Sequence, residues 1–230
     1  MRNLILFLLI IGCSSSSGES VDIDKVLTMT VRSIAIAADQ VEYDTEADTT
    51  YRYEMISFKP EEAALILMDV WDSSVNDGFA KRLEQNIVEK LFPAVTYARS
   101  VGINIIHSPH LTNGKHKIHP LCTPIPGEKV VDGATEQQDL EDFLISKNIQ
   151  YVFYVGYASN MCLLMRPTGI PELVHMGFRT VFIRDASLAV ESPFFPMGTT
   201  HEVMTTVYET YGSSISVDEF LTGIGGRDGI

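Results

Sequence analysis

The stretch Val155–Cys162, VGYASNMC, decides the expected fold because it joins a buried strand to a helix through a turn of small residues. The residues before it, Tyr151–Val155, are β-branched or aromatic, as in a central strand covered on both faces. An apolar helical pattern follows and stops at Gly177. Cys162 then begins a helix, where backbone amides are expected to lower the pKa of its thiol and favour thiolate. The alternative is that Cys162 is a small buried hydrophobic residue.

The rest of the chain repeats this order of helix, cap and hydrophobic strand around Gly102, Asn148 and Gly177. The expected strands are 63–68, 103–107, 151–155 and 180–183, with a possible last strand at 215–217, and the expected helices are about 83–101, 140–148, 163–176 and 199–211. Pro93 should kink or split the first helix. Such alternation predicts an α/β fold: a doubly wound, Rossmann-like, mostly parallel sheet with helices on both faces, in a single domain over residues 59–224.

The amino end carries an apolar run, Leu4–Ile11, that is too short to span a bilayer. Residues 1–12 resemble a bacterial lipoprotein signal peptide, which implies lipidation of Cys13, followed by a flexible tether over residues 13–20. The resemblance implies an extracytoplasmic, lipid-anchored protein, on the outer membrane if the source is a diderm. An ordinary secretory leader is the alternative. Residues 21–58 are expected to form a peripheral extension or an edge hairpin.

The formal net charge of −13 and the pI of about 4.8 argue against a nucleic-acid partner, and no lysine and arginine cluster interleaved with aromatic residues is present. Apart from Cys13, the chain has Cys122 and Cys162. An exported domain could join these two in a disulfide, which is the structural rival to a reactive Cys162.

Acidic residues at strand ends add a second functional signal. Asp69 follows the hydrophobic strand at 63–68, and Asp185-Ala186 follow the strand at 180–183. In an open α/β sheet the carboxyl ends of the strands are the usual place for a ligand site. Together with residues 156–162 and the Gly177–Val181 step, these features resemble the isochorismatase-like cysteine hydrolases over about residues 60–220.

The resemblance implies hydrolysis of a small carbonyl compound such as an amide, ureide or carbamoyl compound, without a cofactor. Asp69 would take the thiol proton, Cys162 would attack the carbonyl, and water would hydrolyse the thioester. The family has a cis peptide before the cysteine, which corresponds here to Tyr157 and Ala158. The amides of Ala158 and Cys162 are then the candidates for the oxyanion hole. We also expect a homo-oligomer.

The third member of the family's triad is a lysine, and Lys129 lies where the family places it, 33 residues before Cys162. In many members, however, the lysine follows a short strand, whereas here Val130 and Val131 come after Lys129. If the strand end is the right alignment, Asp132 or Gly133 takes the position. The cation would then come from Lys115, Lys117 or Arg166, or be absent.

The sequence departs from the family in other places. The helix after the cysteine carries Arg166-Pro167-Thr168-Gly169, and the proline should bend or break it. Arg166 is a candidate for binding an anionic substrate group, with a surface salt bridge as the alternative; Trp71 and Tyr157 are the other substrate-binding candidates. The metal-binding histidine pattern of one family branch is missing, so no metal is expected. The histidines that keep a metal site open are His107, His110, His116 and His119.

Three functions remain open from the sequence. The first is a cysteine hydrolase acting on a non-peptide carbon–nitrogen bond of a small-molecule substrate. The second is vinyl-ether hydrolysis of the isochorismatase type, against which the presence of Cys162 argues mildly. The third is a catalytically inactive binding domain that keeps the fold.

Overall fold

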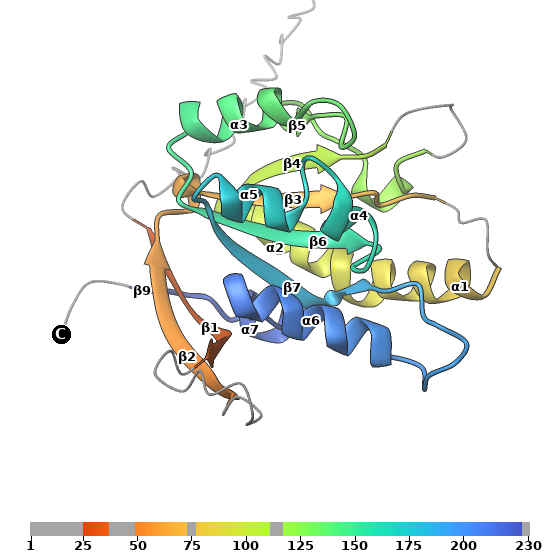
Figure 1. Ribbon diagram of the computed structural model, residues 1–230. Coiled ribbons are helices and arrows are strands. Elements are labelled where there is room, and N and C mark those ends of the chain that lie inside the picture. The colour runs from red at the N-terminus through yellow and green to blue at the C-terminus, as the bar shows by residue number, and fades with distance from the viewer. Residues whose placement is uncertain (1–24, 37–48, 73–76, 111–116, 227–230) are drawn as a thin grey trace, which may run out of the picture.

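Strands and helices alternate along most of the chain, as the hydrophobic pattern predicts. The computed structural model describes residues 25–36, 49–72, 77–110 and 117–226 (Figure 1). The strands are β1 (Val26–Ile36), β2 (Thr49–Phe58), β3 (Ala63–Met68), β4 (Asn104–Ser108), β5 (Lys129–Val130), β6 (Tyr151–Tyr157), β7 (Arg179–Leu188), β8 (Ser213–Ile215) and β9 (Ile224–Gly226). The α-helices are α1 (Asp77–Asn86), α2 (Phe92–Val101), α3 (Gln137–Ser146), α4 (Cys162–Met165), α5 (Ile170–His175), α6 (Thr199–Tyr211) and α7 (Val217–Leu221).

One sheet holds all of these strands. Its order is β2-β1-β8-β7-β6-β3-β4-β5, and β9 pairs with β1. The strands from β8 to β5 in this order are parallel, whereas β1 is antiparallel to β2, β8 and β9. From the central β3–β6 pair, the chain winds outward through β4 and β5 on one side and through β7 and β8 on the other. The expected doubly wound, mostly parallel sheet is confirmed, and its topological switch point lies between β3 and β6.

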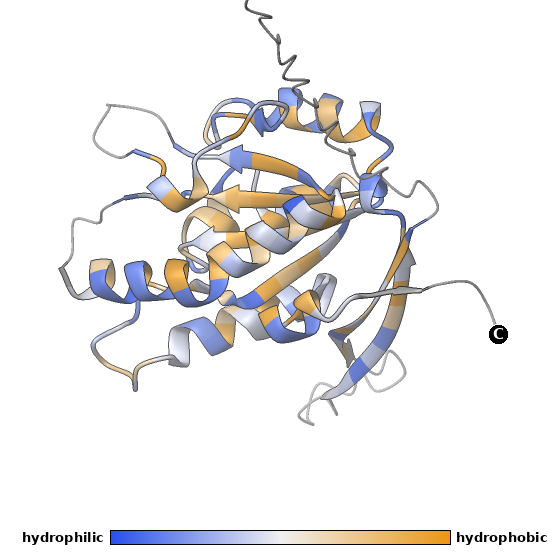
Figure 2. Cartoon of the chain, turned by 180° about the vertical axis from the view of Figure 1, so that it is seen from behind, coloured by the Kyte–Doolittle hydropathy of each residue, from blue (hydrophilic) through white to orange (hydrophobic). Residues whose placement is uncertain are grey.

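The sheet separates two hydrophobic cores because successive residues of a strand face opposite sides. In β3, Leu65 and Leu67 belong to the core beneath α1, α2 and α7. Ala64, Ile66 and Met68 belong to the core beneath α3, α5 and α6. Figure 2 shows hydrophobic residues concentrated on the central strands and on the helices that cover them. Every residue of β3 and β6 is buried, which explains their continuous apolar sequences.

The predicted extension at residues 21–58 contains the antiparallel pair β1 and β2, which widens the sheet at one edge. Its inward side chains, including Leu27, Met29 and Phe58, are part of the same core as α1 and α2. Arg32 of β1 also forms an ion pair with the buried Glu209 of α6, with 2.8 Å between Nη2 and Oε1. The strands β1 and β2 are therefore integrated into the domain by packing as well as by strand pairing.

Proline accompanies an irregularity in two helical segments. The first runs without a break from α1 through a π-helical turn at Ile87–Leu91 into α2, which carries Pro93 at its start, so Pro93 does not split it. The second is divided into α4 and α5 by the segment from Arg166 to Gly169. Proline lacks the amide hydrogen that an uninterrupted helix needs, so the division of the second segment has the expected cause.

The proposed lipoprotein signal peptide, Cys13 and the tether lie outside the described residues. Within the described ranges, no helix has the length and apolar character that crossing a membrane requires.

Candidate active site

The switch point of the sheet brings Asp69 and Cys162 together from positions 93 residues apart in the sequence. Asp69 follows β3 directly, and Cys162 begins α4 after the turn that leaves β6. Since β3 and β6 are adjacent parallel strands, their carboxyl ends lie side by side at one edge of the sheet, where such folds usually have a ligand site. The site is therefore assembled by the central pair of strands.

Asp69 is a buried carboxylate with a strained backbone. It is 1% exposed and has a φ of 47°, a left-handed conformation that aspartate tolerates better than most residues. Its Oδ1 accepts a hydrogen bond from the amide of His110 at 2.6 Å, while Oδ2 has no hydrogen-bond partner of good geometry among the described residues. Burial raises the pKa of Asp69, and the thiol of Cys162, the amide of His110 and the charge of Arg166 oppose this rise. Oδ2 is therefore suited to accept a proton.

The thiol of Cys162 is largely buried beside this carboxylate. Burial raises its pKa to about 12, and the charge and hydrogen bonding of Asp69 act in the same direction. The predicted lowering of its pKa by the helix terminus is therefore wrong, because α4 has only four residues and a buried anion lies nearby. At neutral pH the proton rests on sulfur, and the thiolate forms only when the proton passes to a base.

The turn that carries the cysteine is held by close packing around Gly156. The peptide bond between Tyr157 and Ala158 is cis, as expected from the family resemblance. Gly156 has a φ of 125°, and a Cβ at this position would lie 2.0 Å from the carbonyl oxygen of Met68. Only glycine allows β6 to approach β3 so closely just before Asp69 and the cysteine turn.

Several backbone amides of this turn have no backbone acceptor. The amides of Ser159, Met161 and Leu163 donate to backbone carbonyls. In the described part of the chain, no such acceptor is found for the amides of Ala158, Asn160 and Cys162. The two amides predicted for the oxyanion hole, those of Ala158 and Cys162, are among these three, which is compatible with that role.

Arg166 is the cationic side chain that reaches this site. Its Nη2 lies 3.6 Å from Oδ2 of Asp69, and its side chain is 22% exposed. The positive charge of Arg166 and its hydrogen bond to the sulfur lower the pKa of Cys162, against the larger effects of burial and Asp69. The structure places Arg166 in an ion pair with the buried Asp69 rather than in a surface salt bridge, and its binding of an anionic substrate group stays a prediction.

Lys129 does not join Asp69 and Cys162, so its predicted place in the site is wrong. Its Nζ lies 2.6 Å from Oδ2 of Asp139, on α3. The physical reason is that Lys129 begins β5 and pairs in register with Ile106, two residues before the carboxyl end of β4. At this position, before the strand end, the side chain of Lys129 faces the helix layer that contains α3 instead of Asp69 and Cys162.

The two aromatic substrate-binding candidates differ in position. Tyr157 is 1% exposed, its hydroxyl donates to Oδ1 of Asn86, and its ring packs edge-on against Phe79. It is a core residue and cannot contact a substrate through its side chain, which corrects that expectation. Trp71 is partly buried and its backbone forms a bridge with Ile118, close to the carboxyl end of β3.

A histidine that the sequence did not single out supports the cysteine turn. Nε2 of His201 lies 2.7 Å from the carbonyl oxygen of Arg184, and Nδ1 lies 3.0 Å from the hydroxyl of Ser159. Burial lowers the pKa of His201 despite the Arg184 carbonyl and nearby carboxylates, so the ring is neutral. Nε2 must then donate and Nδ1 must accept the hydroxyl proton of Ser159. The hydroxyl of Tyr208 donates to the carbonyl of Ser159 and holds the same turn.

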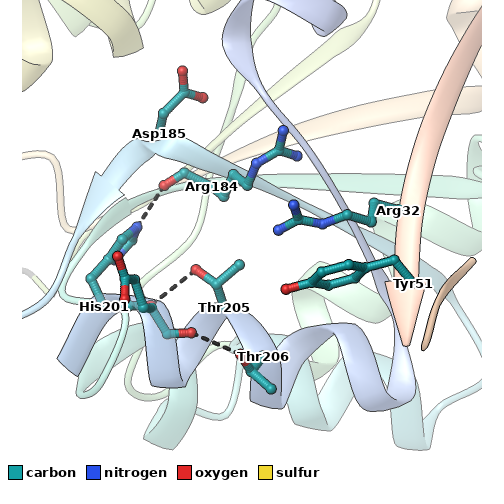
Figure 3. Close-up of a pocket in the computed structure, with 8 residues that line it drawn as sticks. Arg32, Tyr51, Arg184, Asp185, His201, Thr205 and Thr206 are labelled. Atoms are coloured by element: carbon teal, nitrogen blue, oxygen red, sulfur yellow. Dashed lines mark hydrogen bonds between the residues drawn. The ribbon is translucent and has the colours of Figure 1, made fainter. Parts of the chain in front are cut away.

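A cavity of about 480 Å³ lies on the other side of His201, between β1, β2, β7 and α6. Its lining includes Arg32, Tyr51, Arg184 and His201, and both guanidinium groups face it (Figure 3). Each arginine already has a carboxylate partner, Glu209 for Arg32 and Glu219 for Arg184. Neither Asp69 nor Cys162 lines this cavity, so it is distinct from the site at the switch point.

The remaining candidates have structural partners. His107 contacts Glu128 and His119 contacts Glu84, through Nε2 at 2.8 and 3.1 Å, and His110 contributes its amide to Asp69. His116 lies outside the described residues. Among those that are described, no group of three or more His, Cys, Asp or Glu side chains could hold a metal ion. Cys122 and Cys162 are both free thiols, and Cys122 is fully buried, so the disulfide alternative is not found.

Comparison with solved structures gives the same architecture. A cysteine hydrolase from Pseudomonas syringae superimposes with a TM-score of 0.59 at 16% identity, over 71% of this chain and 92% of that one. An isochorismatase from Pseudomonas putida gives a TM-score of 0.57 at 18% identity, over 70% and 91% of the two chains. The chain has the isochorismatase-like fold.

The same fold occurs in a structure described as MAR1 ribonuclease from Caenorhabditis elegans, with a TM-score of 0.59 and 20% identity over 74% of this chain and 85% of that one. No protein-family model and no curated protein sequence matches this chain. The comparisons therefore establish the isochorismatase-like fold, and the chemistry has to be argued from the residues of the site.

Proposed function

We propose that this protein is a cysteine hydrolase that cleaves a non-peptide carbon–nitrogen bond in a small amide, ureide or carbamoyl compound. The observation that carries the proposal is the thiol of Cys162 beside the buried carboxylate of Asp69. A nucleophile next to a base, at the switch point of a doubly wound sheet, is the arrangement that covalent catalysis requires.

In the first half of the reaction, Asp69 Oδ2 takes the proton of Cys162 Sγ as sulfur bonds to the substrate carbonyl carbon. The carbonyl oxygen becomes an oxyanion, to which the amides of Ala158 and Cys162 can donate. The carbon–nitrogen bond then breaks, and the proton held by Asp69 passes to the leaving nitrogen. A thioester and a free amine or ammonia result.

In the second half, water attacks the thioester carbon and gives one proton to Asp69. The carbon–sulfur bond breaks, the acid product leaves, and the proton returns from Asp69 to the sulfur of Cys162. Asp69 acts twice as base and twice as acid over the cycle, so its carboxylate must be able to accept and release a proton near the working pH.

Two other functions remain as outcomes of the test. Vinyl-ether hydrolysis of the isochorismatase type has no need of a nucleophilic thiol, and an inactive binding domain has no need of a base. The negative charge of the chain gives no support to RNA as a substrate, although one protein of the same fold is described as a ribonuclease.

The experiment is a screen of purified protein against small primary amides, ureides and N-carbamoyl amino acids, with released ammonia as the readout. We expect at least one class to be hydrolysed by the wild type and by Cys122→Ala, and by neither Cys162→Ala nor Asp69→Asn. Activity that survives in Cys162→Ala would favour chemistry without a thiol nucleophile. Absence of turnover across the panel, with isochorismate included, would favour the inactive binding domain.

We also propose that the protein is attached to a membrane through lipidated Cys13, on the support of the sequence of residues 1–18. Globomycin, which blocks lipoprotein signal cleavage, should cause accumulation of the precursor in bacterial cells, and Cys13→Ser should not be processed. Normal processing of Cys13→Ser, with soluble wild type, would overturn this proposal.

A further inference from the structure

The site needs a positive charge once the sulfur loses its proton. A thiolate in a largely buried place beside a carboxylate is costly unless a cation compensates it. Arg166 is the only lysine or arginine among the described residues that forms an ion pair with Asp69, with 3.6 Å between Nη2 and Oδ2. The same guanidinium acts on the thiol of Cys162 and lowers its pKa, against the larger effects of burial and Asp69. One guanidinium, with its five N–H groups, thus influences both partners of the proton transfer.

A fixed turn presents Arg166 to the site. The amide of Gly169 donates to the carbonyl of Arg166 at 2.8 Å, which closes a β-turn with Pro167 at its second position. A Cβ at Gly169 would lie 2.7 Å from the carbonyl oxygen of Leu163, so the turn is packed tightly against α4. Arg166 ends α4, since its amide donates to the carbonyl of Cys162 at 3.1 Å, and the turn that follows fixes its backbone beside the site.

Thr168, the third residue of this turn, links the turn to neighbouring segments by hydrogen bonds. Thr168 is fully buried, and its hydroxyl lies 2.9 Å from that of Ser108, at the end of β4. The same hydroxyl donates to the carbonyl of Gly133 at 3.1 Å, and the carbonyl of Thr168 accepts from the hydroxyl of Tyr154 at 2.8 Å. Three separate segments thus hold the residue two positions after Arg166.

The sequence left open a cation at the strand end, near Gly133, and the packing there leaves no room for one. Gly133 lies against β4, and a Cβ there would be 2.9 Å from Oγ and 3.0 Å from the carbonyl oxygen of Ser108. A lysine side chain does not fit at this point without displacing the buried Ser108 and Thr168. Lys129, at the start of β5, is occupied by Asp139.

We propose that Arg166 is the cationic catalytic residue of this site and stabilises the sulfur anion of Cys162 while Asp69 holds the proton. The proposal rests on the proposed hydrolase function and assigns its third catalytic group to the turn after α4 instead of the end of β5. Because a guanidinium stays protonated, this cation is present at every pH at which the protein is folded. It also gives Arg166 a role at the reacting atoms in place of the predicted binding of a substrate anion.

The test measures the rate at which iodoacetamide alkylates Cys162 in the full chain, with mass spectrometry of the Cys162 peptide as the readout. The rate is measured from about pH 6 to about pH 10, because the thiolate is the reactive form and its fraction rises with pH. The variants are Arg166→Met, Arg166→Lys and the matched control Lys129→Met. Other groups that face the thiol or its partner are Asp69, His110 and Tyr208, and all are unchanged in these variants.

We expect Arg166→Met to be alkylated about tenfold more slowly near neutral pH, the effect of a pKa higher by about one unit. Arg166→Lys should lie between Arg166→Met and the wild type, and Lys129→Met should equal the wild type. A purely structural role for Arg166 predicts equal losses in Arg166→Lys and Arg166→Met, with unfolding midpoints lowered to match. That result, or wild-type rates in a folded Arg166→Met, would overturn the proposal.

The result is separable from the proposed function because alkylation requires no substrate. If alkylation depends on the charge at residue 166 but the screen finds no hydrolysis, the role of Arg166 in stabilising the thiolate stands and the hydrolase proposal fails. If hydrolysis occurs through Cys162 and neither alkylation nor turnover changes in Arg166→Met, the hydrolase proposal stands and the assignment of Arg166 fails.

Discussion

Replacement of Gly156 by alanine tests how closely the two central strands must approach for the site to form. The new Cβ would lie 2.0 Å from the carbonyl oxygen, 2.8 Å from the carbonyl carbon and 2.9 Å from the amide nitrogen of Met68. These are backbone atoms of β3, so no change of rotamer can relieve the contact. The residue next to Met68 is Asp69, and the turn after Gly156 carries Cys162, so a shift here separates the two reacting groups.

Two destabilising effects combine in this variant. The positive φ of residue 156 costs a non-glycine residue about 1–3 kcal/mol. Overpacking in a rigid core costs a further 1–3 kcal/mol or so, and contact with backbone places Gly156→Ala at the upper end of that range. The expected loss is therefore about 4–6 kcal/mol, a large part of the stability of a typical domain, which is about 5–15 kcal/mol.

The assay is urea unfolding followed by circular dichroism, with Gly177→Ala as the matched control. Gly177 also has a positive φ, 91°, but its Cβ would meet no described atom within 4 Å. The control therefore carries the backbone strain without the clash. We expect Gly156→Ala to lose about 2–3 kcal/mol more than Gly177→Ala, a midpoint difference of about 1–2 M urea. If Gly156→Ala cannot be purified, the soluble yields of the two variants should follow the same order.

Equal losses of stability in the two variants would refute the reasoning, because the close approach of β3 and β6 at Met68 would then contribute nothing. A second refutation would be a Gly156→Ala protein that is destabilised as expected and keeps the wild-type rate of Cys162 alkylation, since the geometry of the site would not depend on this contact.

The remaining predictions concern titrating groups. Asp69→Asn should lower turnover by a factor of about 10² to 10⁴ with the fold intact. Because burial raises the pKa of Asp69, wild-type turnover should already be lost, as the pH falls, at pH values above the ordinary aspartate pKa of about 3.9. Glu128→Gln should lower the urea midpoint at pH values above about 4.3, the ordinary glutamate pKa. Although burial opposes it, hydrogen bonds from Arg99, Ile125 and His107 lower the pKa of Glu128, so its stabilisation is lost as the pH falls through that lowered value and the two midpoints should converge. Cys122, whose pKa burial raises to about 12, should be alkylated only in urea, and labelling of the native protein at this residue would contradict its burial.

Much of the fold follows from local sequence. The continuous apolar residues of β3 and β6 can only belong to strands buried on both faces, and Asp69 and Cys162 follow these strands directly. The positions of the Asp69 carboxylate and the Cys162 thiol relative to the sheet were therefore predictable. Pro167 likewise marks the break between α4 and α5, because it removes a backbone donor.

The electrostatics of the site were not predictable in the same way. A helix start favours a thiolate when the helix is long and exposed, but α4 ends after one turn and Cys162 lies beside a buried carboxylate. Whether Lys129 or another residue reaches Asp69 depends on the register of β5 against β4, which a two-residue strand does not encode in its hydrophobic pattern.

Long-range support of the site is also invisible in the sequence. His201 lies in an ordinary amphipathic helix, α6, and nothing near it in the sequence indicates a contact with Ser159, 42 residues earlier. The only local signal is a polar residue in the first turn of α6, and a solvent-exposed histidine would give the same signal.

The central claim, that Cys162 is a nucleophile activated by Asp69, is tested most directly by trapping the acyl-enzyme. The protein is mixed with p-nitrophenyl acetate, quenched in acid within seconds and digested, and the peptides are analysed by mass spectrometry. The account predicts an acetyl group on Cys162 in the wild type, with release of p-nitrophenolate, and far less of it in Asp69→Asn. Acetylation confined to other residues, or wild-type release of p-nitrophenolate by Cys162→Ala, would contradict it.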